Sequence, residues 1–242
     1  IGVRLVGSEM CIRDRVSAVG NDKRGQKAIE ILKEFGIDTS LIKTVSDTPT
    51  GTVGVEMDAD GSHRFTIHED SSWDQLAWTS QLAAEIKSAD AVYFGTLSQR
   101  SEFARSQIRR ALDEAKSAGV LRILDINLRE PFFDSKLIRE SIALASVLKL
   151  SEEELDVAAL ACETPLEGGA VAMLRSLVER FDLEAVVMTR GADGALFVTA
   201  KNSIEQPGIP AEVVDTVGAG DSFTAVLLVG LLRGEEVSSV LQ

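Results

Sequence analysis

The chain has 242 residues, of which 45% are hydrophobic, and its formal net charge is −13. This length fits one large α/β domain with or without a small appendage, and it allows a sizeable core. The acidic balance argues against nucleic acid as a partner, because phosphate backbones bind basic surfaces. No uncharged apolar run reaches the roughly 18 residues of a membrane span, so we expect no membrane partner. The two cysteines do not suggest a disulfide framework and favour a reducing, cytoplasmic setting.

The first part of the chain divides into three segments. Residues 1–15 show neither helical nor strand periodicity, and we interpret them as a leader outside the fold. Structure-like patterning begins at residues 16–20, and an apolar stripe at Ala28, Ile31, Leu32 and Phe35 then predicts a helix that stops at Gly36. Two strands over residues 52–68, joined by a turn at 58–61, predict a hairpin that projects as a small β lid.

From residue 91 onward, short apolar strands alternate with amphipathic helices. The predicted strands cover residues 91–94, 121–126, 147–150 and 185–189, and 195–199 is expected to return as a hairpin partner. The predicted helices cover residues 102–117, 135–145, 152–160, 169–180 and 219–232. Such alternation is typical of an α/β fold, with a mostly parallel sheet and helices on both faces. We therefore expect one domain over residues 16–242.

The most informative motif is the stretch from residue 215 to 221, between a valine strand and a long apolar helix. Small residues at Gly218, Ala219 and Gly220 let backbone N–H groups approach a bound group, and a helix start carries about half a positive charge. Together these predict an anion site. Asp221 would repel a resting anion, so we expect it to take a proton from a nucleophile that attacks a phosphate. The alternative is a glycine-rich turn that only starts a helix.

Two further strand-end loops are candidate ligand sites, because ligands of open α/β sheets bind beyond the carboxyl ends of strands. Thr189, Gly191 and Gly194 could hold a nucleotide phosphate or ribose, although by itself this loop is better read as a tight turn. Asn127 and Arg129 follow the strand 121–126 and could point into the same crevice. Arginine suits a transferring phosphoryl group through its fixed charge and forked donors. The alternative there is a capping loop with a surface arginine.

The loops after strands 147–150 and 91–94 also carry polar groups. Ser151 is a good helix N-cap and Glu154 completes a capping box, which suffices to explain the pattern. A functional reading would have Glu154 hold a metal ion through water. The loop that contains Gly95 and Gln99 could face a polar substrate, and its alternative is a plain loop before the N-cap Ser101.

These motifs together resemble the ribokinase-like (PfkB) family of carbohydrate kinases over residues 16–242. Residues 215–221 match the family's C-terminal signature Asp-Thr-x-Gly-Ala-Gly-Asp at every specified position. Residues 19–25, 36–40 and 49–53 follow the family's N-terminal course, and residues 95–100 and 125–132 look most like its fructokinase branch. The resemblance implies an ATP-dependent sugar kinase, with fructose to fructose 6-phosphate as the best guess.

The resemblance implies a role for each motif. Asp221 would be the base that activates the sugar hydroxyl, and the backbone of Gly218, Ala219 and Gly220 would form an anion hole. The remaining contacts with the sugar would come from Gly95, Gln99, Asn127 and Arg129. The contacts with ATP would come from Lys149, Thr189, Gly191 and Gly194.

Two cations are also implied by the resemblance. Glu154 matches the acidic member of the family's Asn-x-x-Glu magnesium motif, but Ser151 stands where asparagine is usual. Asp215 and the Val217 carbonyl would help to hold a monovalent cation, often K⁺. ATP, Mg²⁺ and K⁺ are thus the expected cofactors, and the β lid around residues 52–68 is expected to cover the sugar and to form a homodimer contact.

Both ends depart from the family pattern. Its first strand, its sugar-binding aspartate and its Gly-Gly segment have no match in residues 1–15, and the chain stops soon after the signature helix. We therefore expect an incomplete domain that is weakly active or inactive by itself. Alternative substrates are ribose, 2-keto-3-deoxygluconate and nucleosides. Outside catalysis, the alternatives are a sugar- or nucleotide-binding protein on a kinase fold and, least favoured, an acidic interaction domain.

Overall fold

The computed structural model describes residues 13–57, 63–210, 216 and 218–241. The chain forms two compact units. The N-terminal unit comprises Ile1–Ala89 and Ser98–Ala111, and the sheet unit comprises Asp90–Leu97 and Leu112–Gln242. The chain passes between the units after Ala89, after Leu97 and, within the helix α3 (Glu102–Ser117), after Ala111.

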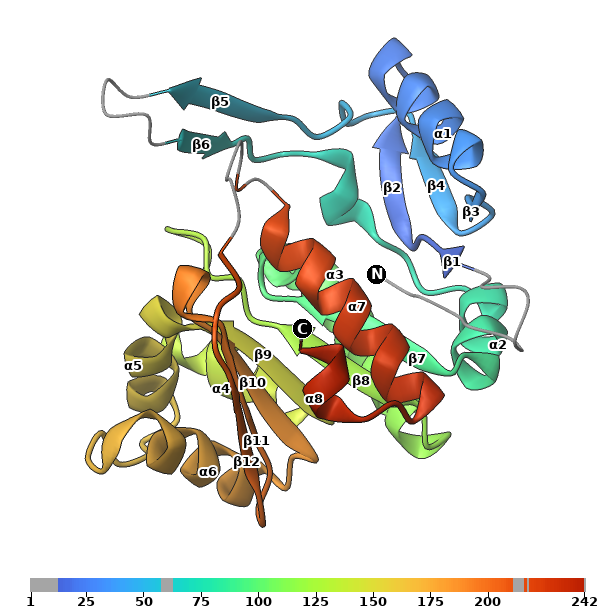
Figure 1. Ribbon diagram of the computed structural model, residues 1–242. Helices are drawn as coiled ribbons and strands as arrows, with labels where there is room; N and C mark the ends of the chain where they lie inside the picture. The colour runs from blue at the N-terminus through green and yellow to red at the C-terminus, as the bar shows by residue number, and fades with distance from the viewer. Residues whose placement is uncertain (1–12, 58–62, 211–215, 217, 242) are drawn as a thin grey trace. The chain divides into compact units, whose positions relative to one another are not determined.

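The described part of the sheet unit is built on six strands in the order β12-β11-β10-β9-β8-β7 (Figure 1). Strands β7 to β10 are mutually parallel, and β11 and β12 are antiparallel additions at one edge. The strands are β7 (Ala91–Gly95), β8 (Leu121–Asp125), β9 (Val147–Ser151), β10 (Ala185–Thr189), β11 (Ala195–Val198) and β12 (Ser203–Gln206). The predicted mostly parallel sheet is confirmed, including the hairpin return after β10.

Helices cover both faces of this sheet. The crossover helices α4 (Ser135–Ala143), α5 (Glu152–Ala161) and α6 (Gly169–Phe181) gather on one face, as right-handed connections between neighbouring parallel strands require (Figure 1). On the other face lies α7 (Ala219–Arg233), followed by α8 (Val237–Val240). The helices predicted for this half of the chain are all present, within two residues at each end.

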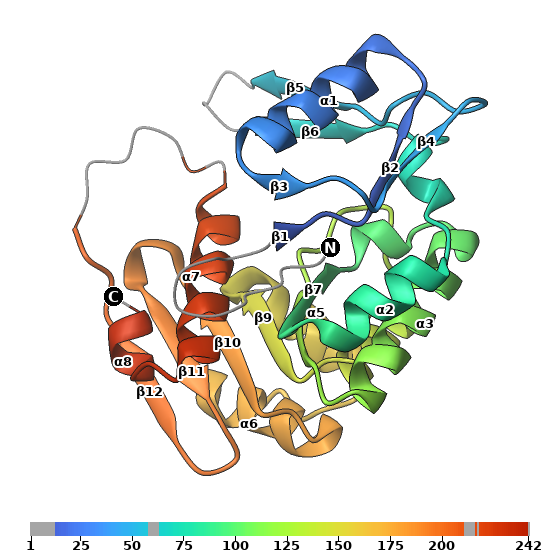
Figure 2. The same cartoon turned by 90° about the vertical axis from the view of Figure 1, so that its right-hand side faces the viewer.

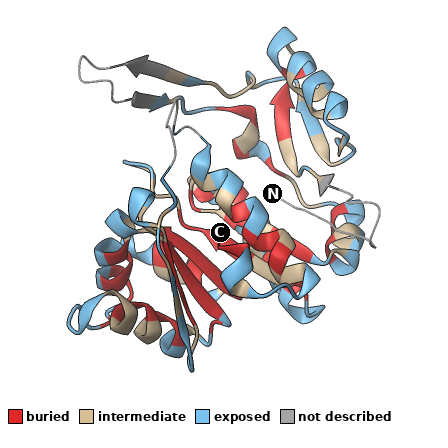
Figure 3. Ribbon diagram, viewed as in Figure 1, coloured by how far each residue is buried: buried red, intermediate tan, exposed pale blue. Residues whose placement is uncertain are grey.

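The core of the sheet unit lies in the parallel strands, which are drawn mostly as buried in Figure 3. Phe94, Leu124, Leu148 and Val187 are 0% exposed. Parallel strands with helices on both faces read as near-continuous apolar runs, because neither face meets water. Lys149 breaks such a run in β9 and is itself only 6% exposed.

Within residues 13–57 and 63–89, the N-terminal unit forms three two-stranded sheets, β1–β3, β2–β4 and β5–β6. In Figure 2, α1 runs alongside its short strands. The predicted hairpin is present as a ribbon of its own. The elements are β1 (Arg13–Asp14), β2 (Ser17–Gly20), α1 (Lys23–Glu34), β3 (Ile37–Asp38), β4 (Ile42–Val45), β5 (Val53–Met57), β6 (His63–Ile67) and α2 (Ser80–Ser88).

Two boundaries in this unit differ from the sequence interpretation. Arg13–Asp14 pairs in parallel with Ile37–Asp38, so the described fold begins inside the segment assigned to a leader. Helix α1 begins at Lys23, ahead of its apolar stripe, because the Asp22 carboxylate accepts a hydrogen bond from the Gly25 N–H at 2.8 Å and caps the helix.

A clamp around Arg100 anchors the chain where the hairpin ends. The guanidinium donates to both Asp74 carboxylate oxygens, at 2.9 and 2.7 Å, and to the His68 carbonyl at 2.8 Å. It also lies 5.2 Å from the centre of the Trp73 ring, which packs so closely on Gly51 that a side chain there would overlap it. Residues just before β5 and just after β6 are therefore tied to one buried cation.

Two absences hold for the described part of the chain. None of its helices is long and apolar enough to cross a membrane. No group of three or more His, Cys, Asp or Glu side chains in that part could hold a metal ion. Cys162 is a free, fully buried thiol whose pKa is raised by burial to about 11, and Cys11 lies outside the described residues.

Candidate active site

The carboxyl ends of four parallel strands meet at one edge of the sheet unit. Gly95 is opposite Asp125, Asp125 is opposite Lys149, and Ser151 is opposite Thr189. Most of the loops singled out in the sequence follow these strands directly. The parallel register therefore gathers them at the place where open α/β sheets bind ligands.

Hydrogen bonds tie these loops to one another. The Thr96 hydroxyl donates to the Ile126 carbonyl at 2.7 Å, which joins the loops after β7 and β8. One Glu154 oxygen accepts from the Leu128 N–H at 2.6 Å and the other from the Ser151 N–H at 2.8 Å. The reciprocal half of the predicted capping box is thus confirmed, and Glu154 additionally fixes the loop between Asn127 and Arg129.

The two polar residues of that loop differ in burial, because Asn127 is partly buried and Arg129 is exposed. Asn127 adopts a positive φ of 38°, a conformation in which asparagine is enriched among non-glycine residues. Arg129 follows two residues later and is exposed. The backbone turn at Asn127 is held by the Leu128 contact with Glu154, so its geometry depends on the start of α5.

The signature loop, by which we mean the described residues Gly218–Asp221 of the signature, starts α7 as the sequence predicts. Gly218 is the N-cap, with a φ of 80° and a ψ of 0°, and Ala219 is the first helical residue. The Ser222 N–H donates to the Gly218 carbonyl at 2.9 Å, which closes the first turn. Asp221 is exposed within that turn. Asp215 and Val217, assigned to a monovalent cation, lie outside the described residues.

A cavity of about 310 Å³ joins the signature loop to the loop after β10. Thr189, Gly191 and Gly194 line one part of it, and Ala219 and Gly220 line another. Pocket volumes of this order suit small-molecule ligands. The remaining lining residues were not singled out in the sequence and are Ala195, Pro207, Gly208, Ile209, Phe223 and Leu241.

The turn after β10 approaches the segment after β12 very closely. Gly194 has a φ of 93°, and a side chain there would overlap the Gln206 carbonyl. A side chain at Gly208 would likewise overlap the Ala192 carbonyl. Glycine is required at both positions because backbone meets backbone, and this contact shapes the wall of the cavity.

A buried polar network lies beneath the signature loop. The Lys149 ammonium is 3.2 Å from an Asp125 oxygen, and the two residues are 6% and 1% exposed. The Thr224 hydroxyl lies 3.1 Å from the other Asp125 oxygen and 2.9 Å from the Gly220 carbonyl. Burial raises the pKa of Asp125, and the Lys149 charge opposes that rise.

The structure refines two of the predicted assignments. Lys149, expected near ATP, lies under Gly220, where its ammonium would be 3.3 Å from an added Cβ. Gln99 is fully buried and belongs to the N-terminal unit, whereas Gly95 belongs to the sheet unit. Sequence reasoning missed Asp125 and Thr224. Thr224 could have been found from its position four residues after Gly220, the spacing at which a helical threonine bonds back to a carbonyl.

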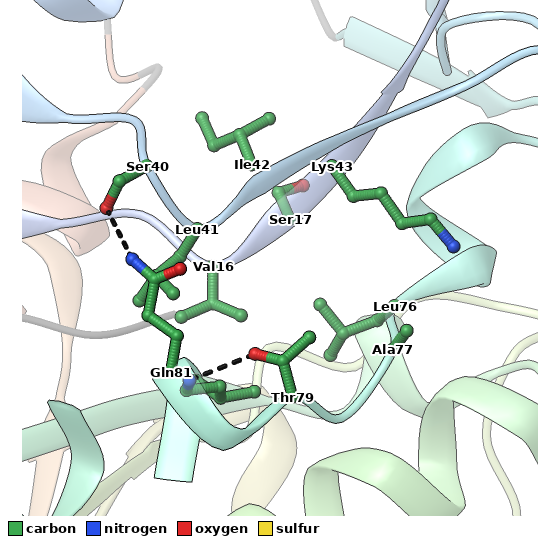
Figure 4. A pocket seen from close by; sticks show the side chains of 11 residues that line it. Val16, Ser17, Ser40, Leu41, Ile42, Lys43, Leu76, Ala77, Thr79 and Gln81 are labelled. Atoms are coloured by element: carbon green, nitrogen blue, oxygen red, sulfur yellow. Dashed lines mark hydrogen bonds between the residues drawn. The ribbon is translucent and has the colours of Figure 1, made fainter. Parts of the chain in front are cut away.

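A second cavity, of about 220 Å³, lies within the N-terminal unit (Figure 4). Its walls are mainly apolar, with Val16, Leu41 and Leu76 among them. The Gln81 side-chain amide reaches the Ser40 hydroxyl at 3.4 Å across one side. Among the described residues that line it, Lys43 alone is ionisable, and these residues offer no acid–base pair.

Comparison with known proteins places these features in a family. The family model for pfkB family carbohydrate kinases matches residues 14–242. Fructokinase-1 of Zea mays is 30% identical over 224 residues, which cover 90% of this chain and 68% of the relative. The aminoimidazole riboside kinase of Salmonella typhimurium is 27% identical over 224 residues, covering 90% and 67%.

A solved structure agrees with these sequence matches. The structure of a sugar kinase from Pyrococcus horikoshii in complex with ATP has a TM-score of 0.76 at 26% identity, and the match covers 95% of this chain and 71% of that one. The chain spans about two thirds of the length of the curated relatives it matches. Because the family model matches nearly the whole chain, and because the signature loop and the sheet topology agree with it, the chain belongs to the pfkB family of carbohydrate kinases.

Proposed function

We propose that the protein is an ATP-dependent sugar kinase that transfers the γ-phosphoryl group to a sugar hydroxyl, with fructose to fructose 6-phosphate as the leading reaction. One observation carries the proposal. A single cavity joins the start of α7 at Ala219 and Gly220 to the loop of Thr189, Gly191 and Gly194. An anion site and a nucleotide-sized space are thus continuous at the ligand-binding edge of the sheet.

The signature loop supplies two requirements of phosphoryl transfer. That reaction needs in-line positioning, charge neutralisation and a base for the attacking hydroxyl, and little covalent work from the protein. The N–H groups that begin α7 point out of the helix start and stabilise negative charge on the transferring group. Asp221 is exposed in the same turn and accepts the proton of the sugar hydroxyl. Asn127 and Arg129 orient substrate groups from the neighbouring strand end.

Glu154 fits a supporting role toward magnesium. Each of its oxygens accepts one backbone N–H, which leaves each with a further lone pair for a metal-bound water. Bound through ATP phosphates and water, Mg²⁺ supplies charge neutralisation at the phosphates. The K⁺ site assigned to Asp215 and Val217 rests on the family resemblance.

The choice of sugar rests on the loops and on the relatives. Residues 95–100 and 125–132 resemble the fructokinase branch, and the maize relative is named a fructokinase. The Salmonella relative acts on a riboside by its name, which keeps ribose and nucleosides as alternatives beside 2-keto-3-deoxygluconate. A cytoplasmic location and a homodimer formed through the hairpin complete the proposal.

The proposal is tested by sugar-dependent ADP release with Mg²⁺-ATP across fructose, ribose, 2-keto-3-deoxygluconate and adenosine. We expect release with one sugar above the sugar-free rate, with fructose the strongest. ATP binding with no release for any sugar would instead favour a nucleotide-binding protein on a kinase fold. Preference for adenosine over fructose would replace the fructokinase assignment with a nucleoside kinase.

A further inference from the structure

The buried lysine of β9 raises a physical question, because a charge in an apolar strand is costly unless it is paired. Lys149 lies between Leu148 and Leu150, both 0% exposed. Its partner is Asp125, the residue opposite it in the parallel register of β8 and β9. A neutral apolar residue at each position would fill the same space without the desolvation penalty, so the pair needs a reason beyond packing.

The pair is joined to the signature loop by two contacts. Thr224, on the buried face of α7 and 2% exposed, has its hydroxyl within 3.1 Å of Asp125 and 2.9 Å of the Gly220 carbonyl. The Lys149 ammonium comes within 3.3 Å of the position a Gly220 Cβ would occupy. The positive end of the ion pair therefore lies against the loop itself, and the negative end is held through Thr224.

We propose that Asp125, Lys149 and Thr224 form a positioning network that fixes the start of α7 and adds a buried positive charge to its anion site. The inference deepens the proposed kinase function and rests on it. Lys149 is a positioning residue in this account rather than a direct ATP ligand. In a buried setting its charge is poorly screened, so it acts on an anion at the loop without needing to touch it.

Removing the positive charge and removing the negative charge should have different effects on anion binding if the role is electrostatic, and similar effects if it is structural. The probe is inorganic tripolyphosphate, and binding to the full chain is measured by calorimetry. We expect Lys149→Met to weaken tripolyphosphate binding at least tenfold, because the loop then faces an unpaired Asp125. We expect Asp125→Asn to bind at least as tightly as the unaltered chain, because the Lys149 charge is no longer offset.

The double variant Asp125→Asn/Lys149→Met supplies the control for folding. It removes both charges, so its stability should lie closer to that of the unaltered chain than the stability of Lys149→Met does. Its tripolyphosphate affinity should nevertheless stay low. Recovery of affinity together with stability, or an equal loss in both single variants, would show a purely structural pair and overturn the inference.

Substitutions of Thr224 provide an independent test that leaves both charges in place. Thr224→Val removes the hydroxyl link to Gly220 and should weaken binding, and Thr224→Ser should restore it. Equal binding by both variants would refute the link. Failure of the unaltered chain to bind tripolyphosphate would overturn the inference as a whole. Because these arms measure binding, absent sugar-dependent ADP release would count against the proposed function alone.

Discussion

At the scale of single residues, two glycines in the turn after β10 differ in what a side chain would meet. At Gly194 a Cβ would overlap the Gln206 carbonyl, whereas at Gly191 nothing lies within 4 Å. Both have positive φ, 93° and 55°. Gly194→Ala must move backbone, and Gly191→Ala carries only the strain of a left-handed residue, roughly 1 kcal/mol.

We therefore expect Gly194→Ala to lower ATP affinity and the melting temperature together. Gly119→Ala, at a φ of 73° with nothing within 4 Å of an added Cβ, lies outside the cavity lining; it should lower the melting temperature slightly and serves as the matched control. Nucleotide titration and thermal unfolding of both variants measure the difference. Equal ATP affinity for the two would mean that the close approach of these backbones does not shape the nucleotide cavity.

The sequence predicted the chemical motifs of the site better than their connections. The assignment of Asp221 and the three small residues before it rests on a local pattern, a turn that opens a helix, and the structure shows that helix start at Gly218. Asp125 and Lys149 are 24 positions apart in the sequence, and their pairing depends on the register of two strands, which no local pattern encodes. Gln99 was grouped with Gly95 by its motif, but the unit boundary falls between them.

At the scale of elements, the start of α1 depends on a single carboxylate. Asp22 accepts from the Thr50 N–H at 2.9 Å, from the Thr50 hydroxyl at 2.8 Å and from the Gly25 N–H at 2.8 Å. The bonds from Thr50 and Gly25 lower the pKa of Asp22 from 3.8 to about 2. The carboxylate thus fixes both the helix start and the segment before β5.

Because the folded pKa lies below the ordinary value, this contribution to stability is present above about pH 4 and is lost as pH falls through about 2. We expect Asp22→Asn to be less stable than the unaltered chain at pH 7, with the difference shrinking toward pH 2. Urea unfolding at several pH values measures it. A difference independent of pH would contradict the assigned role of the carboxylate.

The Arg100 clamp predicts a second effect on an element. The side chains of Arg100 and Asp74 are 5% and 11% exposed, and breaking a buried pair costs about 3 kcal/mol or more. Arg100→Lys keeps the positive charge but cannot reproduce the two-pronged contact, so it should lower the free energy of unfolding by part of that amount. Arg24→Met, an exposed control on α1, should change stability by less than about 0.5 kcal/mol.

Urea unfolding measures these losses, and hydrogen exchange should show faster exchange at the His68 N–H, which bonds to the Thr52 carbonyl at 3.3 Å. Unchanged exchange in Arg100→Lys would mean that the clamp does not hold the base of the hairpin.

Regular elements with strong periodicity were the predictable ones. The helix at residues 102–117 and the strand at 185–189 were predicted with the boundaries observed. Strand β12 was missed because its sequence is polar and because, at a sheet edge, its successive residues differ little in burial. Strands β3 and β4 were missed because two to four residues carry too little pattern.

At the scale of the whole molecule, the hairpin β5–β6 forms a two-stranded sheet of its own. Such a ribbon is marginal in water unless other chain covers it. Val53, on β5, is 44% exposed. A hairpin-mediated homodimer therefore predicts that Val53→Lys shifts the protein toward monomer in sedimentation experiments.

Phe103→Lys on α3, where the phenylalanine is 50% exposed, is the control and should leave the association unchanged. A protein that is monomeric throughout the micromolar range, or one whose association is insensitive to Val53→Lys, would refute a dimer through the hairpin.

The most direct test of the account compares Asp221→Asn with Asp113→Asn, which alters an exposed aspartate on α3. Sugar-dependent ADP release and ATP affinity are measured for both variants and for the unaltered chain. The account predicts that Asp221→Asn lowers release about 10²- to 10⁴-fold while ATP affinity is kept, as loss of a general base should. Undiminished sugar-dependent release in Asp221→Asn would contradict the assignment of the start of α7 as the catalytic centre.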